Sequence, residues 1–114
     1  MSIEDAQIPG AGPAERGYRA GEVYFLASRH RPRGAAASSY GVLIQVRAVT
    51  ASGEPVLRSS GRQLVADYTH SVPKTHLVDG TATAEDVVRA AFEGAALALL
   101  QEVATERAND ELEL

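Results

Sequence analysis

The sequence predicts an α+β fold, in which a three-stranded antiparallel sheet is followed by one long helix (βββα). Three segments rich in β-branched and aromatic residues, near residues 22–28, 40–50 and 55–68, succeed one another between loop-forming glycines, prolines and serines. Residues 81–107 form a fourth segment, rich in alanine and leucine, in which apolar residues recur at spacings of three and four. We therefore expect a sheet with strand order 3-2-1 and the long helix packed across one of its faces.

The composition bounds the class of protein. A chain of 114 residues fits one domain that is large enough to bury a core. Its formal net charge of -4 argues against a basic coat for nucleic acid but leaves room for one local basic site. The absence of cysteine excludes disulfides, thiolate metal sites and cysteine nucleophiles. The start of the chain does not resemble a signal peptide, and no run approaches the roughly 18 apolar residues of a membrane span. We expect a cytoplasmic protein with no membrane partner.

The two ends of the chain lack the side chains of a packed core. Residues 1–17 combine two prolines with several glycines and few large apolar residues. Such a segment buries too little surface to offset its ordering entropy. We expect a disordered tail at residues 1–17, a single βββα domain at residues 18–107 and a short acidic tail at residues 108–114.

The predicted strands differ in regularity. Residues 22–28 are apolar at both alternating sets of positions, which indicates a strand covered on both faces. The third strand is expected to bend near residues 59–61 and to resume through residues 63–68, because a Ser-Ser-Gly run interrupts it. Residues 70–80 contain a proline and a glycine and are expected to connect this strand to the helix.

The helix carries its own start signal and a wide apolar surface. Thr83, with Asp86 three residues later, has the spacing of a capping box. A core-facing stripe is expected from six residues: Val88, Ala91, Phe92, Ala95, Leu99 and Val103. Further apolar residues lie outside this stripe, so a second side of the helix needs cover.

We expect a second copy of the chain to provide that cover, most simply in a two-fold dimer. The expected interface consists of Ala90, Gly94, Leu97, Ala98 and Leu100. Close packing on a strand or on another helix would account for Gly94, since glycine costs about 1 kcal/mol relative to alanine inside a helix. An unpaired edge of the first strand would add hydrogen-bonding groups to the same surface.

Two segments resemble the opening half of a ribonuclease H-like domain. Residues 23–46 contain a short apolar strand, a Gly/Pro-rich loop and a Tyr-Gly pair at Tyr40, as in the first hairpin of that family. The helix is similar to the first helix of the family, in which the matching positions are Thr83, Ala90, Gly94, Ala98 and Leu99. The resemblance implies a module whose βββα order is that of the start of the ribonuclease H-like fold.

The resemblance does not extend to the catalytic carboxylates. In the family, an aspartate that ends the first strand and a glutamate in the first helix help to hold two magnesium ions for phosphodiester hydrolysis. Ser28 and Val87 occupy these positions here, and neither is a suitable ligand for a hard dication. A shift of one position would bring Asp86 into play, but it turns the side chain by about 100 degrees around the helix. The later carboxylates of the family are not expected in this chain, so we expect no catalytic residues, no metal and no cofactor.

Another constellation could be drawn as a metal site. It consists of His30, His70 and His76 with Asp67 and Asp79. No pair among them has the spacing of a known ligand motif. Surface histidines in loops and at strand ends are the simpler interpretation.

Basic residues gather in the loop after the first strand. Arg29, His30, Arg31 and Arg33 fall within five residues. Guanidinium groups match phosphate oxygens well, and in the resembling family this loop borders the nucleic-acid groove. We expect weak, salt-sensitive binding of nucleic acid here, and a merely solvated loop is the competing interpretation.

Three functional hypotheses remain open at this point. The first is a non-catalytic ribonuclease H-like module that acts by self-association, and by binding nucleic acid or a protein. The second is a ribonuclease H-type nuclease, or half of its site, that needs a partner chain and a divalent metal. The third is an accidental likeness, with the chain being a small βββα binding protein. Calorimetry with a divalent metal separates the first two, because only the nuclease needs the ion.

Overall fold

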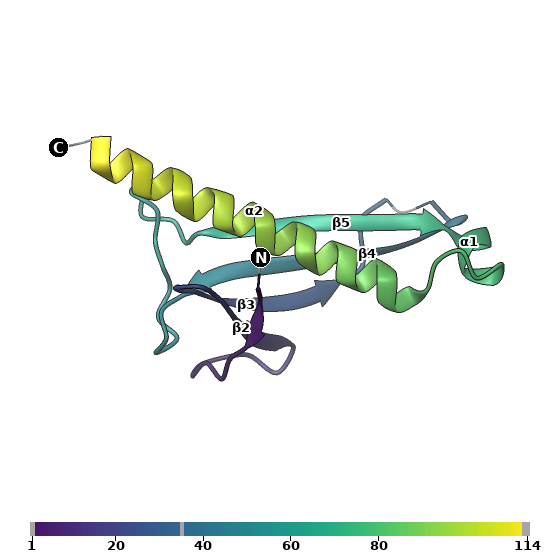
Figure 1. Cartoon of the computed structure of the whole chain (residues 1–114), viewed down its shortest axis with the longest axis horizontal. Coiled ribbons are helices and arrows are strands. Elements are labelled where there is room, and N and C mark those ends of the chain that lie inside the picture. Colours follow the sequence, from purple (N-terminus) through teal and green to yellow (C-terminus); the bar gives the residue numbers. More distant parts are fainter. Residues whose placement is uncertain (1, 35, 113–114) are drawn as a thin grey trace.

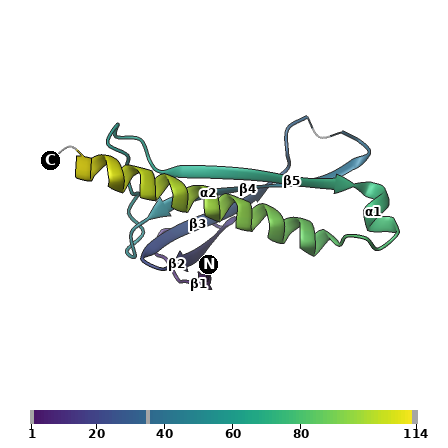
Figure 2. The same ribbon diagram turned by 45° about the horizontal axis from the view of Figure 1, so that its top comes forward.

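The protein is a five-stranded antiparallel sheet with one long helix on a single face. The computed structural model describes residues 2–34 and 36–112, with side chains as far as residue 109. The strands are β1 (Glu4–Asp5), β2 (Glu15–Ala20), β3 (Val23–His30), β4 (Ser39–Val49) and β5 (Val65–Pro73). They are paired in the order β1-β2-β3-β4-β5. A short helix, α1 (Lys74–Val78), leads to α2 (Ala84–Leu112), which crosses the sheet mainly over β4 and β5 (Figure 1, Figure 2).

The α+β class, with an antiparallel sheet followed by a helix, is confirmed, but the sheet has five strands and not three. β3, β4 and β5 stand in the order predicted for the three expected strands. The two additional strands arise from the N-terminal segment for which the composition predicts a disordered tail. All of β1 and the first half of β2 fall within residues 1–17.

Local pairing explains why this N-terminal segment is ordered. A two-residue turn, Gly21-Glu22, joins β2 to β3, and Gly21 has the positive φ of 60° that such hairpin turns require. Tyr18 then stacks on Phe25 with 5.7 Å between ring centroids and packs against Phe92 at 4.6 Å. The composition of the segment does not reveal this hairpin, because its turn and its aromatic contacts involve only a few residues.

The segment before β2 also covers the sheet. Ile8 is buried against Leu26 and Val49 on the face opposite α2, with Ala6 and Tyr24 packed beside them. β3 is therefore covered on both faces, by α2 on one and by residues 6–8 on the other. This is the arrangement that its two apolar faces predict.

The predicted bounds of the third strand, residues 55–68, are wrong. β5 begins at Val65 and runs to Pro73, so it includes residues predicted as a connection. Residues 55–63 instead form a side loop held by two isolated bridges, Val49–Pro55 and Leu57–Gln63. Gly61, with φ of 87°, makes the turn of this loop where the Ser-Ser-Gly run predicts a bend.

The main core lies between α2 and the sheet. Small helix residues, Ala91, Ala95 and Ala96, are fully buried and let the helix backbone approach the strands. Phe25 and Leu99 are the largest fully buried side chains in this layer. β3 and β4 contribute further aliphatic residues, and three more members lie outside these strands: Ala27, Val42, Ile44, Val46 and Ala48, with Ala20, Leu64 and Val87.

The helix starts as its sequence predicts and ends later. The backbone N–H of Asp86 donates to Thr83 Oγ1 at 3.1 Å, and the N–H of Thr83 donates to Asp86 Oδ2 at 3.2 Å, which is a capping box. α2 continues to Leu112 through most of the predicted acidic tail, and residues 113–114 lie outside the described part. None of the helices in the described part combines the length and apolar character that a membrane span requires.

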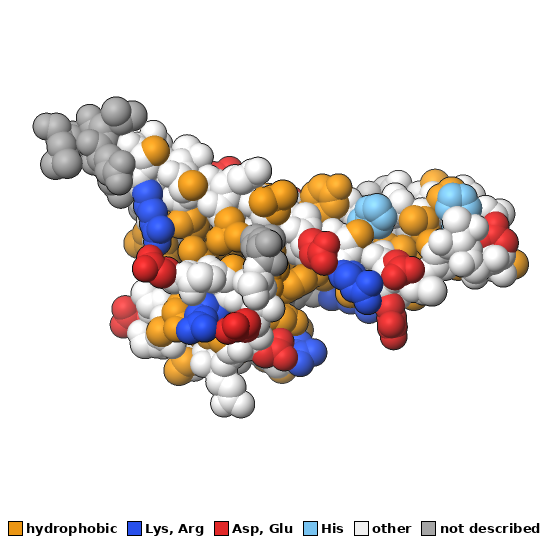
Figure 3. Space-filling model, in the orientation of Figure 1, with side chains coloured by type: hydrophobic (Ala, Val, Ile, Leu, Met, Phe, Trp, Pro, Cys, Tyr) orange, Lys and Arg blue, Asp and Glu red, His pale blue; other side chains and the backbone are white. Residues whose placement is uncertain are grey.

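The residues predicted to form an oligomer interface have different surroundings. Gly94 contacts the ring of Tyr68, so closely that a Cβ atom at this position would collide with it. Leu100 is half-buried against the main core, and Ala90 and Ala98 are also half-buried. Leu97 is 50% exposed. Figure 3 shows hydrophobic side chains gathered over the middle of α2 and along the neighbouring edge of the sheet.

The prediction that the first strand has a free edge is wrong. That strand is β3, and β2 and β4 pair with its two sides. Within the described chain, the outer edges of the sheet belong to β1 and β5 instead.

Candidate anion-binding site

Three of the four predicted basic residues line one hollow at the end of the sheet. The hollow measures about 650 Å³, and its walls include Arg29, His30, Arg31, Tyr40, Gly41 and Lys74. We call it the basic hollow. The fourth predicted residue, Arg33, is exposed on the same loop and is not among the described lining residues. The structure therefore brings Arg29, His30 and Arg31 together and leaves Arg33 aside.

Strand pairing brings Lys74 to this loop from a distant part of the sequence. Ser39 and Pro73 are partners in the β4–β5 ladder, and the backbone N–H of Lys74 donates to Ser38 O at 2.8 Å. This pairing fixes the start of α1 beside the loop between β3 and β4, and both appear at the same end of the molecule in Figure 1. Sequence reasoning missed Lys74 because only the β4–β5 register reveals its position.

A glycine, Gly41, lines the basic hollow where the loop packs on β4. A Cβ atom at Gly41 would lie 3.1 Å from Pro32 Cγ and 3.2 Å from Ser71 Cβ. Such contacts are tighter than ordinary van der Waals distances, so a side chain here would push Pro32 and the basic loop away from the sheet. Gly41 thus leaves room for Pro32 of the basic loop to pack closely on β4.

Two side-chain contacts orient the walls. Arg29 Nη2 donates to Tyr40 Oη at 3.0 Å, which places the guanidinium beside the phenol ring. His30 Nε2 and Ser28 Oγ are 2.8 Å apart on the other face of the strand, because alternate residues of β3 point to opposite faces. Tyr40 is the second residue that sequence reasoning did not place in the site, although the Tyr-Gly pair drew attention to it.

The charges of the basic hollow are not neutralised within the described chain. Arg19, Arg47, Arg58, Arg89 and Arg107 all have a carboxylate within 4.0 Å. Among the described residues, no such ion pair involves Arg29, Arg31 or Lys74. The described lining of the hollow also contains no carboxylate. In a protein of formal net charge -4, this end of the sheet is a local positive site.

A second hollow adjoins the basic hollow on the side of the sheet that faces α2. It measures about 660 Å³, and Arg29 and Tyr40 belong to the walls of both. Its other charged walls are Arg16, Arg89 and Glu85. Arg89 lies 3.6 Å from Asp86, so part of its charge is already balanced. The positive charge therefore extends from the basic hollow toward the start of α2, where Glu85 and Asp86 reduce it.

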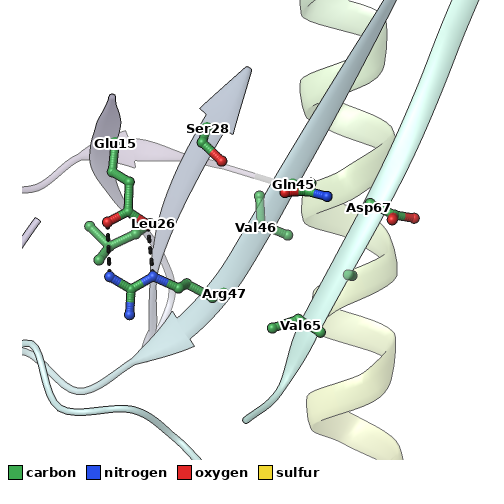
Figure 4. A pocket seen from close by; sticks show the side chains of 9 residues that line it. Glu15, Leu26, Ser28, Gln45, Val46, Arg47, Val65 and Asp67 are labelled. Carbon is green, nitrogen blue, oxygen red and sulfur yellow. Dashed lines mark hydrogen bonds and ion pairs between the residues drawn. The ribbon is translucent and has the colours of Figure 1, made fainter. Parts of the chain in front are cut away.

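The open face of the sheet carries a different hollow, of about 410 Å³, drawn in Figure 4. A row of polar residues crosses it from β2 to β5: Glu15, Ser28, Gln45 and Asp67. Arg47 binds Glu15 through two hydrogen bonds of 2.7 and 2.9 Å. This guanidinium holds the pKa of Glu15 at about 2, well below its usual value of 4.5. Glu15 therefore remains an ionised partner of Arg47, and such a carboxylate is a poor general base at neutral pH.

The histidines and aspartates considered as metal ligands lie apart. Asp67 lies on the open face and His70 on the face that carries α2, because they are an odd number of residues apart on β5. Asp79 accepts hydrogen bonds from the N–H and hydroxyl of Thr81, which lower the pKa of this carboxyl. Within residues 2–34 and 36–112, no group of three His, Asp or Glu side chains is arranged to hold a metal ion.

The two positions matched to catalytic carboxylates of the resembling family point to opposite sides of the sheet. Ser28 lines the open-face hollow (Figure 4). Val87 is 1% exposed in the core between α2 and the sheet. Asp86 is engaged in the capping box and faces Arg89.

Comparison of the chain with protein-family models, curated proteins and solved structures finds no match.

Proposed function

We propose that this chain is a cytoplasmic, non-catalytic binding module that holds phosphate groups of single-stranded nucleic acid in the basic hollow. One observation carries the proposal. Arg29, Arg31 and Lys74 converge on a single hollow with no carboxylate partner among the described residues. A group of neighbouring cations attracts anions, and phosphate matches both the guanidinium fork and the lysine point charge.

The shape of the site supports a nucleotide-sized ligand. A volume of about 650 Å³ lies within the range of small-molecule pockets. Tyr40 offers an aromatic ring beside the cations, and a base can stack on such a ring whatever its identity. Three exposed cations can neutralise few phosphates, so we expect modest affinity with little sequence preference.

The ribonuclease H-like likeness stays part of this proposal. The succession β3, β4, β5 and α2 is consistent with it, although β1 and β2 precede these elements. The alternative function is a nuclease, or half of one, completed by a partner chain and a divalent metal. The positions of Ser28 and Val87 on opposite sides of the sheet favour the non-catalytic module. Heat evolved on titration with magnesium or manganese, together with cutting of an RNA–DNA hybrid, would support the nuclease instead.

Fluorescence anisotropy with a short labelled single-stranded oligonucleotide tests the proposal. We expect binding at low ionic strength, with a slope of log K against log salt of about -2 if about three phosphates are neutralised. Arg31→Ala combined with Lys74→Ala should abolish most of the binding. The control combines Arg33→Ala, on the same loop, with Arg62→Ala, on the distant side loop, so that it also removes two charges, and this control should retain binding.

The outcome that contradicts the proposal is equally specific. Absence of binding at low ionic strength would leave the solvated-loop interpretation. An equal loss of binding in the test variant and in the control, which each remove two charges, would show that only the overall charge matters and that the basic hollow is not the site.

A further inference from the structure

The two outer strands of the sheet have very different edges. β1 has only two residues, Glu4 and Asp5, and both are charged and exposed. A short acidic strand is a poor template for pairing with another chain. β5 has nine residues, Val65–Pro73, whose only carboxylate is Asp67, and no lysine interrupts it. β5 therefore carries few of the devices that usually protect a sheet edge, namely the charge of Asp67 and the proline at its end.

The hydrogen-bonding groups that β5 presents can be read from its ladder. Lys74 N donates to Ser38 O, just beyond the partners Ser39 and Pro73. Because bonded and non-bonded pairs alternate in an antiparallel ladder, the even-numbered residues of β5 turn their N–H and C=O groups toward β4. Asp67, Thr69 and Ser71 turn theirs outward. Val65 does so too, and its carbonyl accepts a 3.4 Å contact from Arg58.

We propose that this edge of β5 is the interface for a second copy of the chain, in a two-fold antiparallel pair centred on Thr69. Thr69 is the midpoint of Val65–Pro73, so this register gives the longest shared ladder. Thr69 then pairs with the partner's Thr69, and Asp67 pairs with the partner's Ser71, so that no like charges stand opposite. A register centred on Asp67 would place two carboxylates face to face. Pro73, which has no N–H, ends the ladder.

The face that carries α2 supplies an apolar contact beside this ladder. Tyr68 is 45% exposed and Leu97 is 50% exposed, and Gly94 brings the helix directly onto the Tyr68 ring. These residues lie next to the β5 edge, where Figure 3 shows exposed hydrophobic side chains. In the proposed register Tyr68 stands opposite the partner's His70, so the two copies cover part of this surface for each other.

The consequence is one continuous ten-stranded sheet with both long helices on the same face. The five strands of each copy add through the β5 pair. Each basic hollow contains Lys74, which directly follows β5, so the two hollows lie at opposite ends of the shared ladder. The assembly does not depend on nucleic acid, and it can be tested in its absence.

Light scattering coupled to size-exclusion chromatography of the full chain gives the first test. Two chains of 12.0 kDa should elute as a species of about 24 kDa (2 × 12.0). Thr69→Pro removes an outward N–H without touching the β4 ladder, and proline is tolerated on edge strands, so we expect a folded monomer. Thr69→Val keeps the N–H and the β-branched shape and should remain a dimer, while circular dichroism checks the fold of both variants.

A crosslinking test does not depend on a destabilising change. The chain has no cysteine, so Thr69→Cys introduces a single thiol, which should face the same introduced thiol of the second copy across the ladder. A short thiol-specific crosslinker should then convert most of the protein to a covalent dimer. Val78→Cys, which places its thiol at a position that is 89% exposed, should crosslink far less because it lies away from the proposed axis.

Either of two results would overturn the interface. One is a monomeric mass for the unaltered chain over its whole soluble concentration range. The other is a dimer in which Thr69→Cys crosslinks no faster than Val78→Cys, which would place the contact on another surface.

Discussion

At the scale of single residues, one ion pair and one glycine fix how the layers meet. Glu15 on β2 reaches across β3 to Arg47 on β4, and its carboxylate also accepts the N–H of Gly12. On the opposite face, Gly94 admits the ring of Tyr68 under α2. Both contacts join elements that are distant in sequence, so each is expected to contribute to the stability of the whole sheet.

The Glu15–Arg47 pair predicts a specific dependence of stability on pH. The folded pKa of about 2 lies below the usual 4.5, so the contribution is present above pH 4.5 and is lost as pH falls toward about 2. The pKa difference corresponds to roughly 3 kcal/mol, and partial exposure of both side chains reduces our expectation to about 2 kcal/mol. Urea unfolding of Glu15→Gln at neutral pH should show this loss.

The controls for this prediction use the same protein. The unfolding free energy of the unaltered chain should fall more steeply between pH 4.5 and about 2 than that of Glu15→Gln. Glu4→Gln removes a carboxylate whose pair with Arg19 is exposed, and it should not alter that slope measurably. Parallel pH profiles for Glu15→Gln and the unaltered chain would contradict the role assigned to the pair.

The Gly94→Ala substitution should change stability in the direction opposite to the one that helix propensity predicts. Alanine should stabilise an exposed helix position by about 1 kcal/mol relative to glycine. Here the added Cβ meets the Tyr68 ring, and overpacking of this kind costs about 1 to 3 kcal/mol. We expect Gly94→Ala to lower the unfolding free energy in the unaltered chain and to raise it in the Tyr68→Ala background. The same sign in both backgrounds would show that the ring does not oppose the side chain.

At the scale of elements, the features that depend on neighbouring residues were predictable from the sequence, and the features that depend on contacts between distant residues were not. The start of α2 follows from Thr83 and Asp86, because a capping box involves only neighbouring residues. β2 was missed because its order comes from the turn at Gly21 and from contacts of Tyr18 with distant aromatic rings. A segment with the composition of a loop can form an ordered strand when neighbouring strands pair with it and distant side chains cover it.

The N-terminal segment provides a test of that correction. Ile8→Ala should lower the unfolding free energy by about 2 kcal/mol, because Ile8 is buried against Leu26 and Val49. Gln7→Ala changes the exposed neighbour and should have almost no effect. Chemical denaturation of both variants gives the comparison. Equal stability of the two would mean that residues before β2 behave as the tail that the composition predicts.

At the scale of the whole molecule, the sheet organises three surfaces with different chemistry. One end carries the basic hollow, the β5 edge turns backbone N–H and C=O groups outward beside the exposed Tyr68 and Leu97, and the open face carries the Glu15–Arg47 pair. Sequence reasoning located most of the basic residues because they are contiguous. Lys74 and the β5 edge could not be placed, since both depend on which strands pair and in which register.

Amide chemical-shift mapping of the full chain with a short single-stranded oligonucleotide tests the central claim most directly. We predict that the largest shifts fall on residues 29–31, 39–41 and 74, which line the basic hollow, and that they fade as salt is added. Shifts centred on Gln45 and Asp67 of the open face, or no shifts at low ionic strength, would contradict the account.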